Sequence, residues 1–253
     1  MLNHSNKTGL SAPIFAMLCL LCLLPPGAAR ALSVGQIDTF QDGTLQDWQM
    51  GNSITTADHM KNIADGGRGG IGDSYLEVAP ISTELSGGNR LTFFNRVQWK
   101  GDYIAAGITA IAMDVNNFSS SEALNLRLGI NGGFIDPSGT SIIGGVFSTA
   151  ASFTLDSGSG WTRVVFSLRP EDLIAVDPAR SSNVMGNDVM ATLAKVSELR
   201  LLNSATPDWS GLPVDAIVGF DNIQAVPLPP ALALFASGLV VLLTKGRKNN
   251  LQT

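Results

Sequence analysis

The sequence predicts an all-β protein, an antiparallel β-sandwich of about nine strands with one short helix. Strand-like apolar runs recur along the middle of the chain, and clusters of Gly, Asn, Asp and Ser separate them. In one run, Leu124, Leu126, Leu128 and Ile130 alternate with polar or small residues, which is the period of a half-buried strand. Only 15% of the 253 residues are charged and 27 are glycine, which argues against a coiled coil or a disordered polyelectrolyte.

The expected strands lie between residues 32 and 225, a segment long enough for one sizeable core. In chain order they are Gln36–Phe40, Ser74–Val78, Arg90–Trp99, Ile108–Val115, Leu124–Ile130, Gly144–Leu155, Trp161–Leu168, Glu198–Leu202 and Ile217–Val226. Turn-forming stretches such as SGGN, NGG, DPSG and DSGSG fall between them. Asn187–Val196 has helical spacing instead, with Asp188 as the expected N-cap. We therefore expect one β-sandwich domain over residues 32–225.

The first 31 residues have the pattern of a secretory signal peptide. Ile14–Leu24 is an unbroken apolar run, and Ala29 and Ala31 form an A-x-A cleavage site. A helix over this run would reach about 17 Å, which is too short for a hydrocarbon core of about 30 Å. A buried N-terminal helix is the alternative. Both cysteines, Cys19 and Cys22, lie in this run, so the exported chain is expected to contain none.

A second apolar segment with a basic flank ends the chain. About 18 residues from Val226 precede Lys245, and a helix of that length spans about 27 Å, close to the thickness of a bilayer. Lys245, Arg247 and Lys248 follow, as the positive-inside rule expects of a cytoplasmic end. We expect a transmembrane helix here, with a C-terminal core helix as the alternative.

This tail resembles the PEP-CTERM sorting signal of exopolysaccharide-producing Gram-negative bacteria. The matching residues are Val226, Pro227, Leu228, Pro229 and Pro230, followed by ALALFASGLVVLL and TKGRK, so the resemblance covers residues 226–248. Leu228 stands where the family usually has glutamate. The resemblance implies export by the Sec translocon and an intermediate held in the inner membrane. It further implies processing by an exosortase and delivery to the cell surface or extracellular matrix.

Three stretches of the body, IDTFQDGTLQDW, GSGWTRVVFSL and GFDNIQAV, resemble the galactose-binding-like jelly roll of many carbohydrate-binding modules. The resemblance implies that the first and last strands lie side by side and that a structural Ca²⁺ often joins them. It points to Asp38, Gln41 and Asp221 as calcium ligands, and calcium prefers oxygen ligands of this kind. Gln41 stands where the family usually has glutamate, which removes one charge. The alternative is that Asp38 and Asp221 are solvated or accept hydrogen bonds from backbone N–H groups in turns.

Exposed aromatic side chains are the candidates for sugar binding, because carbohydrate modules stack sugar rings on aromatic faces. Trp99 and Tyr103 flank the polar segment KGD, and Trp209 lies in the loop ATPDWSGLP. Loops at the rim of a sandwich are frequent binding positions, so these three residues are the expected ligand contacts. Trp48 and Trp161 match positions that pack inside the jelly roll, and we expect them in the core.

Catalysis finds little support in the sequence. His59 is the one histidine after the expected signal cleavage, and its polar surroundings, TTADHMKN, predict a solvated loop. No G-x-S-x-G, H-E-x-x-H or P-loop motif is present, and no E-x-D-x-x-E strand. The stretch GGRGGIG at Gly66–Gly72 is interpreted as a mobile turn. We expect no catalytic residues, with an exported glycoside hydrolase that uses an atypical carboxylate pair as the less favoured alternative.

The formal net charge of −5 combines an acidic body with basic ends. Asp38–Asp221 holds all 21 acidic but only 11 of the 16 basic residues, a net charge of −10. An acidic body without a basic patch argues against nucleic-acid binding. We expect a non-enzymatic surface or matrix protein associated with extracellular polysaccharide. A dedicated carbohydrate-binding module with one defined glycan ligand is the alternative.

Overall fold

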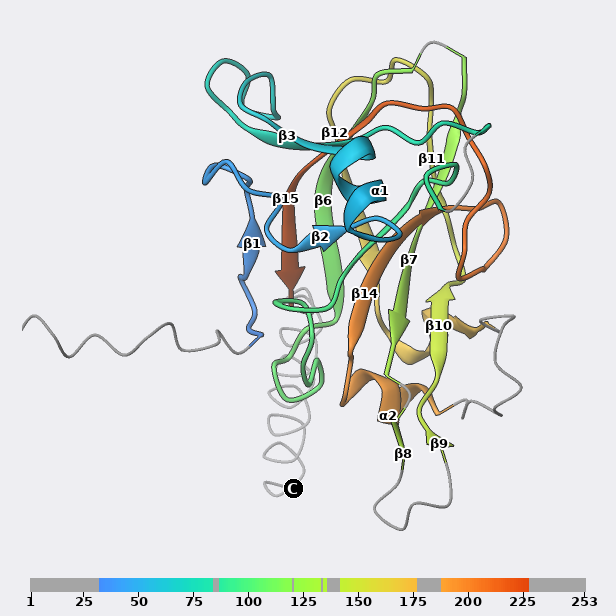
Figure 1. Ribbon diagram of the computed structural model, residues 1–253. Helices are drawn as coiled ribbons and strands as arrows, with labels where there is room; N and C mark the ends of the chain where they lie inside the picture. Colours follow the sequence, from blue (N-terminus) through green and yellow to red (C-terminus); the bar gives the residue numbers. More distant parts are fainter. Residues whose placement is uncertain are drawn as a thin grey trace, which may run out of the picture. The chain divides into compact units, whose positions relative to one another are not determined.

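The computed structural model describes residues 32–83, 87–119, 121–132, 134–135, 142–176 and 188–227 (Figure 1). These residues form fifteen strands: β1 (Ile37–Asp38), β2 (Trp48–Gln49), β3 (Met60–Ile63), β4 (Tyr75–Val78), β5 (Thr92–Asn95), β6 (Ala110–Asn117), β7 (Leu124–Asn131), β8 (Phe134–Ile135), β9 (Ile142–Ile143), β10 (Val146–Thr149), β11 (Phe153–Leu155), β12 (Thr162–Ser167), β13 (Leu173–Ala175), β14 (Glu198–Asn203) and β15 (Val218–Val226). The helices of the same residues are α1 (Ser53–His59), α2 (Val189–Leu193) and the 3₁₀ turn η2 (Pro170–Asp172). The expected all-β class is confirmed.

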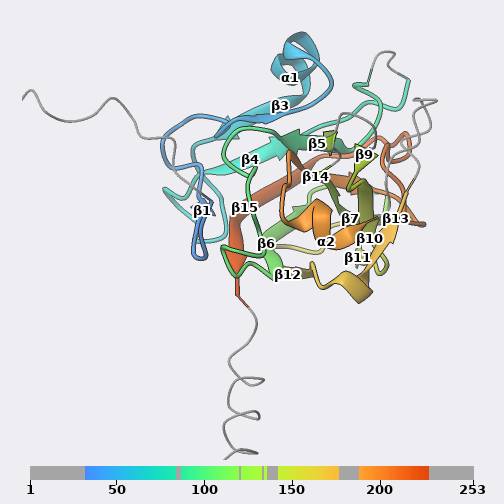
Figure 2. The ribbon, with the colours of Figure 1, turned by 90° about the horizontal axis from the view of Figure 1, so that it is seen from below.

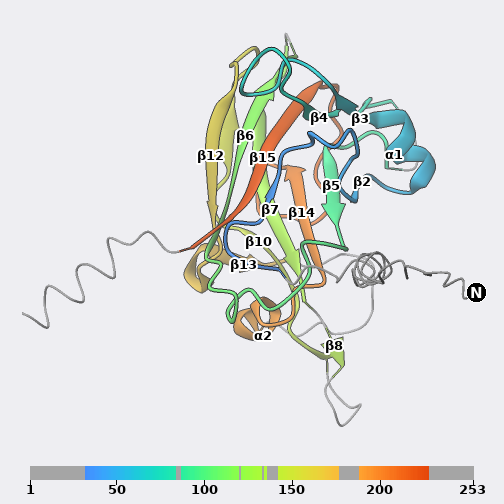
Figure 3. The same cartoon turned by 90° about the vertical axis from the view of Figure 1, so that its left-hand side faces the viewer.

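Two antiparallel sheets pack face to face. Sheet A has the strand order β12-β6-β15-β4-β3, with β1 also paired to β15, and sheet B has the order β13-β10-β7-β14-β5-β2, with β11 also paired to β7. Figures 2 and 3 show the two layers and place β12 at the edge of sheet A far from β3 and α1. The first strand lies beside the last, because Ile37 and Asp38 pair with Gln224 and Ile223. The expected neighbourhood of these two strands is therefore confirmed.

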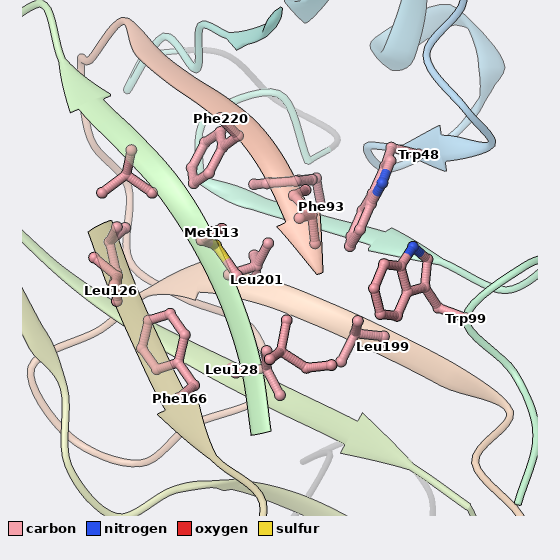
Figure 4. Packing of buried hydrophobic residues seen from close by; sticks show 14 of the residues in the cluster. Trp48, Phe93, Trp99, Met113, Leu126, Leu128, Phe166, Leu199, Leu201 and Phe220 are labelled. Atoms are coloured by element: carbon pink, nitrogen blue, oxygen red, sulfur yellow. The ribbon is translucent and has the colours of Figure 1, made fainter. Parts of the chain in front are cut away.

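The core lies between the sheets. Leu124, Leu126, Leu128 and Ile130 of β7 are all fully buried, as their alternation predicts. Aromatic side chains fill the centre, where the Phe93 ring lies 4.7 Å from Phe220 and 5.2 Å from Trp48 between ring centroids (Figure 4). Such tilted and edge-on ring pairs contribute about 1 kcal/mol each beyond their buried area.

Polar side chains cap both α-helices. The Asp188 carboxylate accepts a hydrogen bond from the Ala191 N–H, so the predicted N-cap of α2 is confirmed. Helix α1 was not expected from the sequence. Its N-cap is Asn52, whose side chain accepts from the backbone N–H groups of Ile54 and Thr55. The last residue of α1 is His59, which is buried and has Nδ1 2.9 Å from the Ala79 carbonyl oxygen, so the expected solvated loop is wrong.

Each of the nine expected strands overlaps an observed strand, although Gly144–Leu155 holds two, β10 and β11. The five others, β2, β3, β8, β9 and β13, are two to four residues long and were not expected. The expected signal peptide with Ala29 and Ala31 lies outside the described residues, as do Leu228, Pro229 and Pro230 of the sorting motif. In the described part of the chain, no helix is long and apolar enough to cross a membrane.

Candidate functional site

Asp38 lies inside the sandwich and is held by three side chains. Its Oδ2 accepts hydrogen bonds from the indole N–H groups of Trp99, at 2.6 Å, and Trp48, at 2.8 Å, and its Oδ1 accepts from the Gln98 amide at 3.1 Å. Burial raises the pKa of Asp38 to about 6, although these hydrogen bonds lower it. The carboxylate thus joins β1 to the two tryptophans, whose rings are drawn in Figure 4.

The three aromatic residues that were expected to contact a ligand are buried. Trp99 and Tyr103 have no exposed surface, and Trp209 is 8% exposed. The Trp99 indole N–H donates to Asp38, and the Tyr103 hydroxyl donates to the Trp99 carbonyl oxygen at 2.8 Å. Trp209 covers Gly129 of β7 and stacks on the Arg200 guanidinium, which lies 3.9 Å from its ring centroid. The expected exposure of these rings is wrong, because each has a polar or cationic partner within the fold.

Two of the three residues that were expected to bind calcium, Gln41 and Asp221, lie beside the same residue, Asp73. The Gln41 amide donates to Asp73 Oδ1 at 2.6 Å, and Asp73 lies close enough to Asp221 to affect its titration. Asp221 is fully buried, and burial together with the Asp73 charge raises its pKa to about 6. Asp38 does not join them, because the tryptophans bind it. Within the described residues, no group of three or more His, Cys, Asp or Glu side chains is placed to hold a metal.

The glycine-rich loop Gly66–Gly72 is fastened to the sheet. Asp221 Oδ2 accepts from the Arg68 N–H at 3.1 Å, and Asp65 Oδ1 accepts from the Gly72 N–H at 2.6 Å. Asp73 also accepts from the Gly69 N–H. These bonds do not fit the mobile turn expected from the sequence. Asp73, which anchors the loop from one end, was not singled out from the sequence because Gln41 and Asp221, which give it a role beyond the loop, lie far away along the chain.

Three aromatic rings form a cluster at the end of sheet A. Centroid distances are 5.3 Å between Tyr75 and Trp161, 5.7 Å between Tyr75 and Phe118, and 6.0 Å between Phe118 and Trp161. The Trp161 indole donates to the Gly66 carbonyl oxygen at 3.0 Å, so the glycine-rich loop fixes its orientation. The Trp161 and Phe118 rings pass over Gly219 of β15, where a side chain would collide with them.

This cluster is partly exposed. Phe118 is 42% exposed and Trp161 is half-buried, so the expected core position of Trp161 is wrong, whereas that of Trp48 is confirmed. Trp161 lies outside the core because it stands in the outward-facing row of β12, which alternates with the buried Val164 and Phe166. Its position just before a strand gave no sign of which face it would take.

Charged and amide side chains lie beside the aromatic cluster on sheet A. The Arg68 guanidinium donates to the Trp161 carbonyl oxygen at 3.3 Å and lies 3.9 Å from Asp114. The Arg163 guanidinium donates to Asp114 at 3.2 Å, and the Asn222 amide donates to the same carboxylate at 3.0 Å. The buried Asp114 thus holds two partly exposed arginines in place beside the rings. We call Tyr75, Phe118, Trp161, Arg68 and Arg163 together the aromatic–arginine surface.

Chemically, this surface combines a flat apolar face with fixed hydrogen-bond donors. Guanidinium groups present planar pairs of donors, and aromatic faces take up apolar C–H surface. The described residues bring no histidine to it, because His59 lies buried at the end of α1. The arrangement therefore suits a ligand that combines an apolar face with hydrogen-bond acceptors.

Several solved structures are similar to this chain. An exo-β-agarase matches with a TM-score of 0.49 and 15% identity, over 78% of this chain but only 26% of the agarase chain. The family 11 carbohydrate-binding module from Clostridium thermocellum, in complex with a β-1,3-1,4-mixed-linked tetrasaccharide, matches with a TM-score of 0.44 and 15% identity, over 77% of this chain and 97% of the module.

A xylan-binding domain, CBM22-1 from Paenibacillus barcinonensis Xyn10C, matches with a TM-score of 0.41 and 12% identity, over 79% of this chain and all of that domain. No protein-family model matches the sequence, and no curated protein is similar to it in sequence. Carbohydrate-binding modules are thus among the solved structures that this chain is similar to.

Proposed function

We propose that this chain is a non-enzymatic, exported surface or matrix protein that binds extracellular polysaccharide through the aromatic–arginine surface. The observation that carries this proposal is the half-buried Trp161 ring beside two arginines that Asp114 holds in place. A sugar ring has an apolar C–H face and a rim of hydroxyl groups. The indole would cover the first, and the guanidinium groups would donate to the second.

A glycan array probed with the purified protein tests this function. We expect binding to at least one neutral polysaccharide, with an about tenfold loss of affinity in Trp161→Ala, which corresponds to about 1.4 kcal/mol for one stacked ring. Ile54→Ala is the matched control, because Ile54 is an exposed apolar residue on α1. Equal binding by Trp161→Ala and Ile54→Ala would mean that the aromatic–arginine surface does not bind the polysaccharide.

The same glycan array distinguishes a general matrix protein from a dedicated carbohydrate-binding module. A dedicated carbohydrate-binding module would bind one polysaccharide, whereas a general matrix protein would bind several that share the same exposed sugar face. Turnover of any bound polysaccharide would instead favour an exported glycoside hydrolase.

Sorting rests on the two ends of the chain. β15 ends at Val226, which is also the first residue of the PEP-CTERM-like motif. The signal peptide would direct the chain to the Sec translocon, and the tail would hold it in the inner membrane until an exosortase processes it. Cell fractionation tests this route: a shortened form at the surface is expected, and an intact tail found only in the inner membrane would contradict it.

Calcium is part of the proposal as a structural ion. Asp73 and Asp221 carry two neighbouring carboxylates with the Gln41 amide beside them, and a shared cation would relieve their repulsion. Asp38 is left out of the set because the two indoles bind it. Calorimetric titration with Ca²⁺ after chelation should show binding and a higher melting temperature, and Asp221→Asn should abolish both. No heat and no change in melting temperature would exclude the ion.

A further inference from the structure

A cavity of about 270 Å³ lies at the edge of the sandwich, away from the aromatic rings. It is lined by the turn after β10, the end of β12 and the 3₁₀ turn η2, namely Thr149, Ala150, Ala151, Ser152, Phe153, Val165, Phe166, Ser167 and Asp172. Trp161 directly precedes β12 and Ser167 ends it, so at about 3.3 Å per residue they are roughly 20 Å apart. Arg163 and the lining residue Val165 are two residues apart on the outward face of β12, so the cavity adjoins the arginine end of the aromatic–arginine surface but lies beyond its rings.

A buried arginine fixes one wall of this cavity. Arg127 is 4% exposed and donates to the carbonyl oxygens of Thr149, at 2.6 Å, and Ala150, at 2.9 Å. Its other N–H groups donate to the carbonyl oxygens of Ser204 and Ala205. The Ala150 N–H in turn donates to the Asp172 carbonyl oxygen at 2.8 Å, which ties the turn to η2. A wall fixed in this way loses little conformational entropy when a ligand binds.

The Asp172 carboxylate is the charged group of the cavity. Its Oδ2 accepts from the Ser167 hydroxyl at 2.5 Å and from Arg169 Nε at 3.0 Å, whereas its Oδ1 accepts no hydrogen bond from any described residue. These bonds lower the pKa of Asp172, so the group is ionised at neutral pH. The Ser152 hydroxyl also has no hydrogen bond within the described residues. No described residue therefore occupies either atom.

The remaining lining is apolar and partly exposed. Val165 is 62% exposed and Phe153 is half-buried, although each is large enough to be covered in a core. The volume is below the roughly 300–1,000 Å³ of sites for drug-sized ligands, so the cavity suits a ligand of about one ring. A lining that combines apolar side chains with a carboxylate and a hydroxyl suits a ring with one C–H face and several hydroxyl donors.

We propose that this cavity binds a single uncharged hexose-sized sugar residue, with Asp172 Oδ1 accepting hydrogen bonds from its hydroxyl groups. Asp172 presents an anionic sugar with a second carboxylate rather than a donor, and the paired Arg169 offsets only part of its charge, so uncharged sugars are favoured. A single-residue site of this kind would take the end of a saccharide rather than the middle of a chain. It requires no contribution from the aromatic–arginine surface.

Saturation-transfer difference NMR on the full chain in mild detergent tests this site, with glucose, galactose, mannose and glucuronate as probes. We expect saturation transfer to at least one neutral hexose and none to glucuronate. Asp172→Asn should weaken hexose binding at least tenfold, because the remaining amide oxygen is already engaged by Ser167. Glu171→Gln is the matched control, since it removes a neighbouring exposed charge that does not line the cavity.

Each outcome decides one site. No transfer to any neutral hexose, equal transfer to glucuronate, or equal losses in the two variants would overturn the cavity as a sugar site. Val165→Arg, which fills the cavity mouth with a side chain on an exposed strand position, should abolish hexose binding in a folded protein. If the Trp161→Ala variant no longer binds polysaccharide but still binds the hexose, both sites are supported. If no polysaccharide binds and the hexose does, only the proposed function fails.

Discussion

Replacing Asp38 by Asn should remove a specific part of the pH dependence of folding. The carboxylate is 3% exposed, and burial raises its pKa from its ordinary value of 3.8 to about 6. Between these pH values the folded protein binds more protons than the unfolded chain, so stability falls as pH rises through about 6. The difference between the two pKa values corresponds to about 3 kcal/mol, at about 1.4 kcal/mol for each pKa unit.

Asn is neutral at every pH and close to the shape of protonated Asp. We therefore expect the free energy of unfolding of Asp38→Asn, relative to the natural protein, to rise by about 2.5 kcal/mol from pH 4 to pH 7.5. A constant offset from the exchange of hydroxyl for amide does not affect this change. Urea unfolding followed by far-UV circular dichroism measures it, with a chelator present to exclude metal binding.

Asp215→Asn is the matched control. Asp215 is exposed and accepts hydrogen bonds from the Ser82 N–H, at 2.7 Å, and from the Ser82 hydroxyl, at 2.5 Å, which lower its pKa. Its contribution to stability is therefore present at neutral pH and lost as pH falls below about 4, the opposite direction to Asp38. A difference in free energy of unfolding between Asp38→Asn and the natural protein that does not change with pH would contradict this prediction. It would mean that the hydrogen bonds from the two indoles fully compensate the desolvation of the charge.

Four other substitutions test particular contacts. Arg127→Met should cost about 3 kcal/mol in urea unfolding, because it leaves four carbonyl oxygens without their donors. Gly219→Ala should weaken polysaccharide binding on the array with little loss of stability, since the new Cβ would lie 2.8 Å from the Trp161 ring at the surface. Gly129→Ala is its control, because the new Cβ would be equally crowded against the buried Trp209. This variant should lose about 1–3 kcal/mol of stability and bind polysaccharide unchanged. Ser148→Ala should raise the melting temperature slightly, because the buried Ser148 hydroxyl has no hydrogen bond within the described residues.

The sequence predicts the strands well where one face must be buried. Alternation places Leu124–Ile130 correctly, because a register shift of one residue would expose every leucine. The expected strand Gly144–Leu155 fails at Ala150, where Arg127 bonds to the backbone and interrupts the strand. That interruption depends on a side chain from another strand, which local patterns do not contain. Helix α1 did carry a local signal, since Asn52 is a favourable N-cap.

The binding residues were harder to predict than the strands. Trp99 and Trp161 have similar neighbourhoods in the sequence, each close to Gly and a charged residue, yet one is fully buried and the other half-buried. The difference arises from distant partners: the Asp38 carboxylate needs the Trp99 indole N–H inside the sandwich, whereas Gly66 accepts from Trp161 at the surface. For these two tryptophans, exposure therefore follows the place of the acceptor that the fold provides for the indole N–H group.

The same reasoning explains why both proposed sugar sites depend on buried charges. Asp114 lies beneath the aromatic–arginine surface and Arg127 beneath the edge cavity, and each is at least nine-tenths buried. A buried charge is retained only where several partners compensate its desolvation, and those partners lose their freedom to move. Here the partners are the groups that form the binding surfaces: the arginines beside Trp161 and the turn that ends at Phe153. The desolvation cost of each buried ion is thus offset by contacts that also fix the geometry of a site. For this reason, removing Asp114 or Arg127 should weaken sugar binding even though neither side chain is expected to touch a ligand.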